Sequence, residues 1–232
     1  HRKIVVVDGK VAFIGGMNIG DEYLKKSTAG SSWRDTHLRI HGPAVLAVQL
    51  AFVEDWYWAQ KNVPELTWTP DEEASDQRVL VIPSSAADEH DNCELLFLNC
   101  INNAKDRIWI ATPYFVPDMQ IMSALQLASA RGVDVRILIP QNPDHKLIYY
   151  AAYSYMVQAD KYGIGIYRYQ LGFMHQKVMM VDDRYCTIGT ANLDNRSMRL
   201  NFEITALMAD KDITLKVKNM LNNDFSVATR MT

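Results

Sequence analysis

One segment of this chain occurs twice, at the start and near the end. The first copy reads HRKIVVVD followed by IGGMN, and the second reads HQKVMMVD followed by IGTAN. In both copies a lysine, an aspartate and an asparagine follow the histidine by two, seven and seventeen residues. These residues are His1, Lys3, Asp8 and Asn18 in the first copy and His175, Lys177, Asp182 and Asn192 in the second. The repeat predicts two equivalent units with the same cluster of polar side chains.

Strand geometry indicates which of these side chains can act together. Residues two apart on a strand share a face, so each histidine and the lysine that follows it point the same way. Each aspartate lies an odd number of residues from its histidine and about 23 Å away along an extended strand. We therefore expect Asp8 and Asp182 at hairpin turns, where Asp-Gly pairs such as Asp8-Gly9 are common. Folding about these turns returns Asn18 and Asn192 to the histidines, although asparagine is also a common turn residue.

A cluster of imidazole, ammonium and carboxamide groups suits a phosphate diester. Lysine supplies a point charge, asparagine supplies amide donors, and neither requires a metal. Two imidazoles that face one phosphorus permit a two-step displacement: one attacks, and the other protonates the leaving alcohol and then deprotonates the incoming one.

Histidines in such roles need partners that fix their tautomers. Asp35 follows His1 by 34 residues and Glu203 follows His175 by 28 residues, each on an expected strand. We assign them as the orienting carboxylates of these histidines, with ordinary ion pairs at strand ends as the alternative.

Alternating strand and helix patterns predict an α/β fold, in which a mixed β-sheet is flanked by helices. The expected strands are 4–7, 11–14, 36–40, 79–82, 107–111, 134–139, 164–168, 178–181, 185–188 and 202–208. The expected helices are 44–60, 92–104, 117–131, 145–162 and 212–225. Residues 62–78 contain two prolines and an acidic cluster, which is typical of a linker.

Two expected helices carry aromatic residues. Those of helix 44–60, Phe52, Trp56 and Tyr57, are expected on its core side. Helix 145–162 carries Tyr149, Tyr150, Tyr153 and Tyr155. Their helical spacing favours the core, and an acyl-chain groove or a membrane interface are the alternatives.

Composition narrows the function classes. The 48% of hydrophobic residues is ample for a core, and the formal net charge of −3 disfavours a protein that coats the nucleic-acid backbone. Cys93, Cys100 and Cys186 lack the spacing of metal ligands, so we expect buried thiols. Neither a membrane-spanning run nor a signal-peptide pattern is present in the sequence as given.

The doubled H-x-K-x(4)-D motif with GGMN and GTAN resembles the phospholipase D superfamily, in which two pseudo-symmetric halves each contribute one motif to a shared site. Further segments are similar to bacterial cardiolipin synthases over nearly the whole chain. These segments are WRDTHLRIHGPAV, TPYFVPD, RGVDVRILIP, GFMHQK and GTANLDNRSMRLNFE.

The resemblance implies transphosphatidylation, in which two phosphatidylglycerol molecules give cardiolipin and glycerol through a phosphatidyl-histidine, without metal or cofactor. It implies that His1 attacks and that His175 acts as acid and base, in a catalytic set with Lys3, Lys177, Asp8 and Asp182. Asn18 and Asn192 would bind phosphate. The implied partners are phospholipids and a membrane surface, with no nucleic acid, and the implied location of the full-length protein is the bacterial inner membrane.

The same resemblance implies an incomplete double domain. Residues 1–61 would be the C-terminal part of a first half, 62–78 a linker and 79–232 a second half. Hydrolysis of phospholipid or, less readily, of nucleic acid is the alternative activity. A fragment that is inert without its upstream half is a further alternative.

Overall fold

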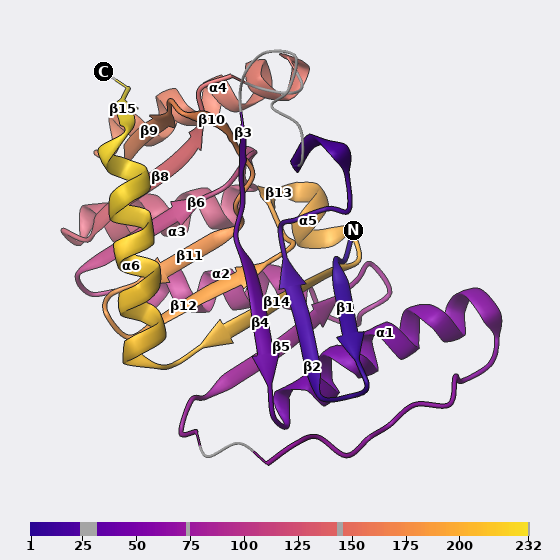
Figure 1. The fold of residues 1–232 in the computed structure, drawn as a ribbon. Coiled ribbons are helices and arrows are strands. Elements are labelled where there is room, and N and C mark those ends of the chain that lie inside the picture. The colour runs from indigo at the N-terminus through magenta and orange to yellow at the C-terminus, as the bar shows by residue number, and fades with distance from the viewer. Residues whose placement is uncertain (24–31, 73–74, 143–145, 232) are drawn as a thin grey trace.

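The structure, a computed structural model, describes residues 1–23, 32–72, 75–142 and 146–231. Its main element is a mixed eight-stranded sheet with helices on both faces (Figure 1). The strand order is β15 (Ala228–Arg230), β9 (Gly165–Tyr169), β8 (Asp134–Pro140), β6 (Arg107–Ala111), β11 (Val178–Val181), β12 (Tyr185–Gly189), β14 (Glu203–Met208) and β5 (Val79–Ser84). Strands β9, β8 and β6 are parallel, and the other neighbours are antiparallel. The predicted α/β fold is confirmed.

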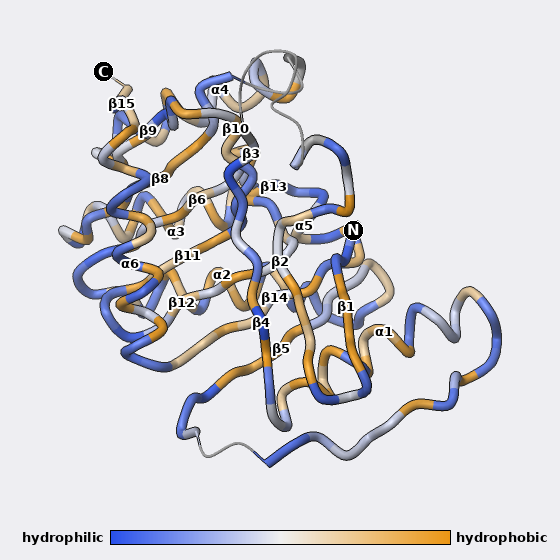
Figure 2. The backbone as a smooth tube through the Cα atoms, viewed as in Figure 1, coloured by the Kyte–Doolittle hydropathy of each residue, from blue (hydrophilic) through white to orange (hydrophobic). Residues whose placement is uncertain are grey.

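Two buried clusters cover the faces of this sheet because successive side chains of a strand point to opposite sides. Ile108 and Ile110 of β6 pack with α2 (Asn92–Asn102), α3 (Met119–Ala130) and α4 (Lys146–Lys161). Trp109 and Ala111 face the other side, towards α6 (Lys211–Ser226) and a small second sheet. Figure 2 shows hydrophobic residues concentrated along the central strands.

The small sheet has the order β1 (Ile4–Val7), β2 (Val11–Gly15) and β4 (His37–His41), and α1 (Ala44–Gln60) packs against it. Its first hairpin has the same register as the hairpin of the second copy, because Ile4 pairs with Ile14 and Val178 pairs with Ile188. The two copies of the repeat are therefore equivalent hairpins in three dimensions.

Short elements join the two units. Strand β3 (Ser32–Arg34) pairs in parallel with β10 (Gly172–Met174), and β13 (Leu193–Asp194) pairs in parallel with β7 (Phe115–Val116). A 3₁₀ turn, η1 (Asp21–Tyr23), and a short helix, α5 (Asn195–Arg199), follow the two hairpins. None of these six elements was predicted, because two to five residues are too few to show a hydrophobic period.

The bounds of α1 are as predicted, but two of the three aromatic residues expected on its core side, Trp56 and Tyr57, are exposed, while Phe52 is partly buried. The buried face is formed by Val45, Val48, Gln49, Ala51 and Val53. Trp56 and Tyr57 are 39% and 53% exposed, because the last turns of α1 extend past β1 (Figure 1). The core expectation also fails for two tyrosines of α4, since Tyr150 and Tyr153 are 70% and 50% exposed.

The three cysteines are buried and free, as predicted, and burial raises the pKa of each thiol to about 12. Residues 62–72 and 75–78 form neither helix nor strand. Among the described residues, none of the helices has the length and apolar character needed to cross a membrane.

Asp182 anchors the second hairpin. Asp8 and Asp182 both adopt φ 53° at their turns, as predicted. The Asp182 side chain is buried and accepts hydrogen bonds from the backbone N–H groups of Lys105 (3.2 Å), Asp106 (2.8 Å) and Arg107 (3.0 Å). This carboxylate therefore ties the hairpin to the start of β6.

We predict that Asp182→Asn lowers the free energy of unfolding by about 2–4 kcal/mol, because an amide cannot satisfy all three donors in a buried site. The neighbouring Asp183 is the matched control. It is exposed and pairs with Arg107 and Lys218, so Asp183→Asn should cost at most about 1 kcal/mol. Urea unfolding followed by circular dichroism measures both changes, and equal losses would contradict the anchoring role of Asp182.

Candidate active site

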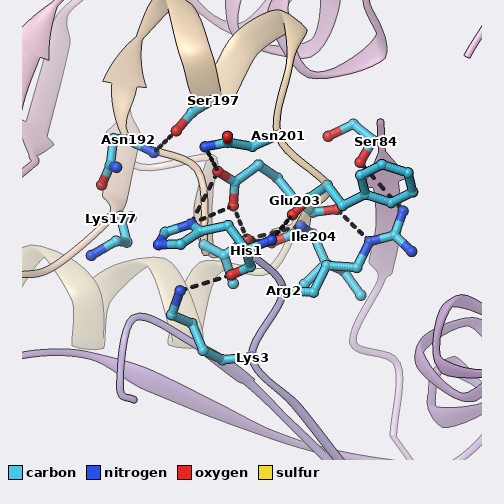
Figure 3. Close-up of polar contacts among 12 residues, drawn as sticks. His1, Arg2, Lys3, Ser84, Lys177, Asn192, Ser197, Asn201, Glu203 and Ile204 are labelled. Atoms are coloured by element: carbon cyan, nitrogen blue, oxygen red, sulfur yellow. Dashed lines mark hydrogen bonds and ion pairs between the residues drawn. The ribbon is translucent and has the colours of Figure 1, made fainter. Parts of the chain in front are cut away.

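His1 is held by a buried carboxylate (Figure 3). Its Nδ1 lies 3.0 Å from Oε2 and 3.1 Å from Oε1 of Glu203, the first residue of β14. Glu203 also accepts hydrogen bonds from the Thr190 hydroxyl at 2.5 Å and from the Asn201 amide at 3.0 Å. Burial raises the pKa of Glu203, and these hydrogen bonds oppose that shift. The contact through Nδ1 leaves Nε2 of His1 available for chemistry.

His175 has a corresponding partner in Asp35. Its Nδ1 lies 2.8 Å from Oδ2 of Asp35, and the other carboxylate oxygen accepts the backbone N–H of Thr36 at 2.8 Å. The Tyr23 hydroxyl also donates to Oδ2, at 2.8 Å. His175 is buried, and this burial lowers its pKa, while the hydrogen bond to Asp35 opposes the shift.

These pairs correct the predicted assignment. Asp35 and Glu203 do contact the two histidines, but Asp35 contacts His175 and Glu203 contacts His1, so each carboxylate belongs to the other copy of the repeat. Separation along the chain suggested the opposite pairing. The site is therefore shared between the two units, and each unit lacks the carboxylate that orients its own histidine.

Strand pairing explains the exchange. Strand β3 ends just before Asp35 and pairs with β10, which ends just before His175. The backbone N–H of His175 donates to the Arg34 carbonyl at 2.8 Å and fixes that register. On the other side, Nε of Arg2 donates to the backbone carbonyl of Glu203 at 3.0 Å, which places the start of the first copy beside β14. Pairings between segments far apart in the chain thus decide which carboxylate meets which histidine.

The two motif lysines make the same local contact. Lys3 Nζ donates to the His1 carbonyl at 2.7 Å, and Lys177 Nζ donates to the His175 carbonyl at 2.6 Å. Lys177 is buried, and burial lowers the pKa of Lys3 to about 8. Each lysine therefore holds its ammonium group beside the backbone of its histidine.

Electrostatics and the close-up view place the two clusters in one site. The charges of both Lys177 and Lys3 contribute to the lowered pKa of His175. Glu203 and Asp35 both raise the pKa of Lys3 against the effect of burial. Figure 3 shows Lys177, Lys3 and Asn192 around the imidazole of His1. Cationic groups from both copies thus surround one space.

The two motif asparagines differ. Asn192 is 6% exposed, and among the described residues its buried Oδ1 has no hydrogen-bond partner. A buried amide that points into a polar site without a partner is suited to a ligand. Asn18 is exposed and follows β2, whereas Figure 3 shows Asn192 beside the imidazole of His1. Its role in binding phosphate stays a prediction.

The motif aspartates lie away from the histidines, at the far ends of the hairpins. Asp8 is exposed at its turn, and the carboxylate of Asp182 is occupied by backbone N–H groups. Their place in the motif is therefore explained by hairpin geometry. The predicted catalytic set included both aspartates. Among the described residues, neither aspartate has a contact that supports a direct part in the chemistry.

The residue between histidine and lysine anchors each motif to a helix. In the first copy Arg2 forms an ion pair with Asp55 of α1 at 2.9 Å. In the second copy Gln176 donates to Asp224 of α6 at 2.7 Å, and Arg34 of β3 binds the same carboxylate at 2.9 Å. The middle residue of each motif thus points away from the site and fixes the strand that carries the histidine and lysine.

An open cavity of about 380 Å³ adjoins His1. Its other lining residues are Arg2, Asp55, Trp58 and Phe202, and the Arg2 guanidinium lies 5.4 Å from the centre of the Phe202 ring. Within the described ranges, no group of three or more histidine, cysteine, aspartate or glutamate side chains could hold a metal ion.

Sequence reasoning missed three groups that hold the orienting carboxylates, namely Tyr23, Thr190 and Asn201. Thr190 occupies the position in the second copy that Gly16 occupies in the first copy. Its hydroxyl was a usable signal, since a buried hydroxyl needs a partner. Tyr23 and Asn201 gave no signal because their contacts depend on the tertiary fold.

The chain is similar to known proteins in both sequence and fold. A family model described as "Cardiolipin synthase, PLD-like domain" matches residues 97–225. The chain is 51% identical over 234 residues to cardiolipin synthase A of Pseudomonas putida strain GB-1, and 47% identical over 232 residues to that of Pseudomonas aeruginosa strain LESB58. These alignments cover 100% of this chain and 48% and 47% of the relatives. The chain thus spans about half the length of the curated relatives it matches.

Solved structures show the same fold. Phosphatidylserine synthase of Haemophilus influenzae Rd KW20 matches with a TM-score of 0.78 and 16% identity, over 100% of this chain and 63% of that chain. The phospholipase D family member Nuc of Salmonella typhimurium matches with a TM-score of 0.56 and 22% identity, over 67% of this chain and 99% of that chain.

The lowered pKa of Lys3 gives a prediction for anion binding. Lys3 loses its positive charge as the pH rises through about 8. The affinity for sulfate, whose own charge is constant in this range, should therefore fall about eightfold between pH 7.5 and pH 9. Isothermal titration calorimetry on the protein at its full natural length measures this change.

Lys3→Arg is the control, because a guanidinium stays charged throughout this range. This variant should bind sulfate equally well at both pH values. An equally constant affinity in the unaltered protein would show that Lys3 does not contribute its charge to an anion site.

Proposed function

Because this chain belongs to the family of cardiolipin synthase, phospholipase D-like domains, we propose that it carries the reaction centre of a phosphatidyltransferase that makes cardiolipin. The observation that carries this proposal is the pair of exchanged contacts, His1 with Glu203 and His175 with Asp35, around cationic side chains. Two imidazoles, each bound through Nδ1 to a carboxylate, have their Nε2 atoms available for one substrate. This is the arrangement that a two-step displacement at phosphorus requires.

The first step transfers a phosphatidyl group to the protein. Neutral His1 donates a hydrogen bond from Nδ1–H to Glu203 and attacks the phosphorus of phosphatidylglycerol with the lone pair of Nε2. The bond from phosphorus to the glycerol oxygen breaks, and the Nε2 proton of His175 passes to that oxygen. Glycerol leaves, and a phosphatidyl group remains on His1. Lys3 and Lys177 stabilise the negative charge on the phosphoryl oxygens.

The second step reverses the roles at the same atoms. His175, now neutral at Nε2, takes the hydroxyl proton of a second phosphatidylglycerol. The resulting oxygen nucleophile attacks phosphorus, the N–P bond breaks, and cardiolipin forms with His1 restored. Asp35 accepts the hydrogen bond from Nδ1–H of His175 throughout, so the imidazole keeps its orientation in both steps.

The cavity beside His1 supports a lipid substrate. Trp58 and Phe202 line it with aromatic surface and are 73% and 41% exposed. Apolar walls in a cavity that also includes His1 suit a group that carries acyl chains. The cardiolipin synthase A relatives support phospholipids as the substrates.

We further propose that the whole protein works at a membrane surface and resides at the bacterial inner membrane, where such lipids lie. The proposed division of the chain is unchanged: 1–61 as part of a first half, 62–78 as a linker and 79–232 as a second half. The equal registers of the two hairpins support this division.

The decisive experiment supplies phosphatidylglycerol in mixed micelles to the protein at its full natural length. Cardiolipin and free glycerol should appear in equal amounts, because each transfer releases one glycerol. Mass spectrometry of the lipids and an enzymatic glycerol assay measure them. Formation of phosphatidic acid without cardiolipin would replace this proposal with hydrolysis.

The two proposed histidine roles predict that variants of His1 and His175 respond differently to a change of leaving group. Phosphatidyl-p-nitrophenol releases an anion that needs no proton from an acid. His175→Gln should therefore keep the initial release of p-nitrophenol, while its release of glycerol from phosphatidylglycerol should slow about 10² to 10⁴-fold. His1→Gln should lose both activities, because it lacks the nucleophile.

Trapping the intermediate provides the control for this assignment. Alkaline quenching preserves phosphohistidine, and peptide mapping should find the phosphatidyl group on His1. A phosphatidyl group on His175 would exchange the two roles.

A further inference from the structure

In both copies of the repeat, a hydroxyl group holds the carboxylate that orients a histidine. Ser197 follows the second-copy histidine by 22 residues and lies in α5. Its hydroxyl accepts the backbone N–H of Asn192 at 3.1 Å and helps to lower the pKa of the nearby Glu203. Tyr23 follows the first-copy histidine by the same 22 residues, ends η1 and donates to Asp35 at 2.8 Å. The short elements η1 and α5 therefore occupy equivalent places in the two units.

The two carboxylates differ in a second hydroxyl. The Thr190 hydroxyl donates a hydrogen bond to the Glu203 carboxylate. The backbone N–H of Thr190 donates to the carbonyl of Ile204, the residue after Glu203, at 3.0 Å. Gly16 makes the equivalent backbone contact with Thr36 at 3.0 Å. A Cβ atom at Gly16 would lie 2.0 Å from a carboxylate oxygen of Asp35, so this position has no room for a side chain.

Tyr23 reaches further than its counterpart Ser197. Its hydroxyl oxygen lies 3.1 Å from Nδ1 of His175 as well as 2.8 Å from Asp35. The Tyr23 ring packs 5.2 Å from Trp33, and the Trp33 ring lies 5.0 Å from the imidazole. The phenol, the carboxylate and the imidazole thus form one contact group, fixed by aromatic packing.

We propose that Tyr23 is a positioning residue for the general acid and base His175. Its hydroxyl holds Asp35, and through Asp35 it holds the imidazole of His175. The position that Thr190 occupies beside Glu203 is a glycine, Gly16, beside Asp35. Asp35 therefore receives no hydroxyl group from that position, and Tyr23 supplies one instead. The inference rests on the proposed function, in which His175 protonates the leaving alcohol.

The test removes one hydroxyl from each side of the site, in the protein at its full natural length. Tyr23→Phe leaves the ring in place and should reduce glycerol release from phosphatidylglycerol about tenfold, because it loses a hydrogen bond to a charged group. Its initial release of p-nitrophenol from phosphatidyl-p-nitrophenol should be unchanged, since that leaving group needs no acid. A purely structural role for Tyr23 would slow both reactions alike.

Thr190→Val is the matched variant, because Thr190 holds the carboxylate of the nucleophile. It should slow the release of glycerol and of p-nitrophenol by similar factors. Tyr162→Phe, at an exposed tyrosine just after α4, should leave both reactions unchanged. The proposal is overturned if Tyr23→Phe leaves glycerol release unchanged, or if it slows p-nitrophenol release as much as glycerol release.

The unaltered protein shows whether the proposed function or the role of Tyr23 is wrong. An unaltered protein that releases p-nitrophenol and glycerol but forms no cardiolipin would reject the transferase and leave the test of Tyr23 intact. An unaltered protein that releases neither would reject both proposals.

Discussion

The contacts between each histidine and a carboxylate of the other copy are the constraint on which the site depends. The side chains of Glu203 and Asp35 are 0% and 2% exposed, and a buried carboxylate is costly unless every oxygen has a partner. The structure supplies those partners from the histidines, from nearby hydroxyl groups and from a backbone N–H group. Because the partners come from both units, the histidines are oriented only when the two units pack together. Assembly of the site therefore depends on the packing of the two units.

The symmetry of the repeat is strict in the backbone and relaxed in the side chains. Both hairpins have the same register, both turns have an aspartate at φ 53°, and both lysines bind the carbonyl of their histidine. The surroundings of the histidines differ, since one is 35% exposed and the other 7% exposed at the side chain. A displacement with one nucleophile and one acid requires two imidazoles with different protonation states. The unequal surroundings distinguish the two imidazoles, and the more buried one, His175, has the lowered pKa.

The elements that sequence periodicity could detect were predicted well. Every predicted helix and strand is present, with bounds that differ by two residues or fewer, because these segments are long enough to show a hydrophobic period. The exposed aromatic residues of α1 and α4 were misplaced, since a helical period shows that a face is apolar but not what covers it. The short strands β3 and β10 escaped prediction, although they bring Asp35 to His175.

The sequence by itself determined the candidate chemistry: the motif histidines and lysines, the hairpins that carry them and the two carboxylates that contact the histidines. Those follow from residue types at fixed offsets, which local backbone geometry converts into shared faces and turns. Only the tertiary structure decided which carboxylate orients which histidine and which hydroxyl groups hold the carboxylates. These contacts join residues that are up to 202 positions apart, and separation along the chain does not indicate proximity once strands from different units pair.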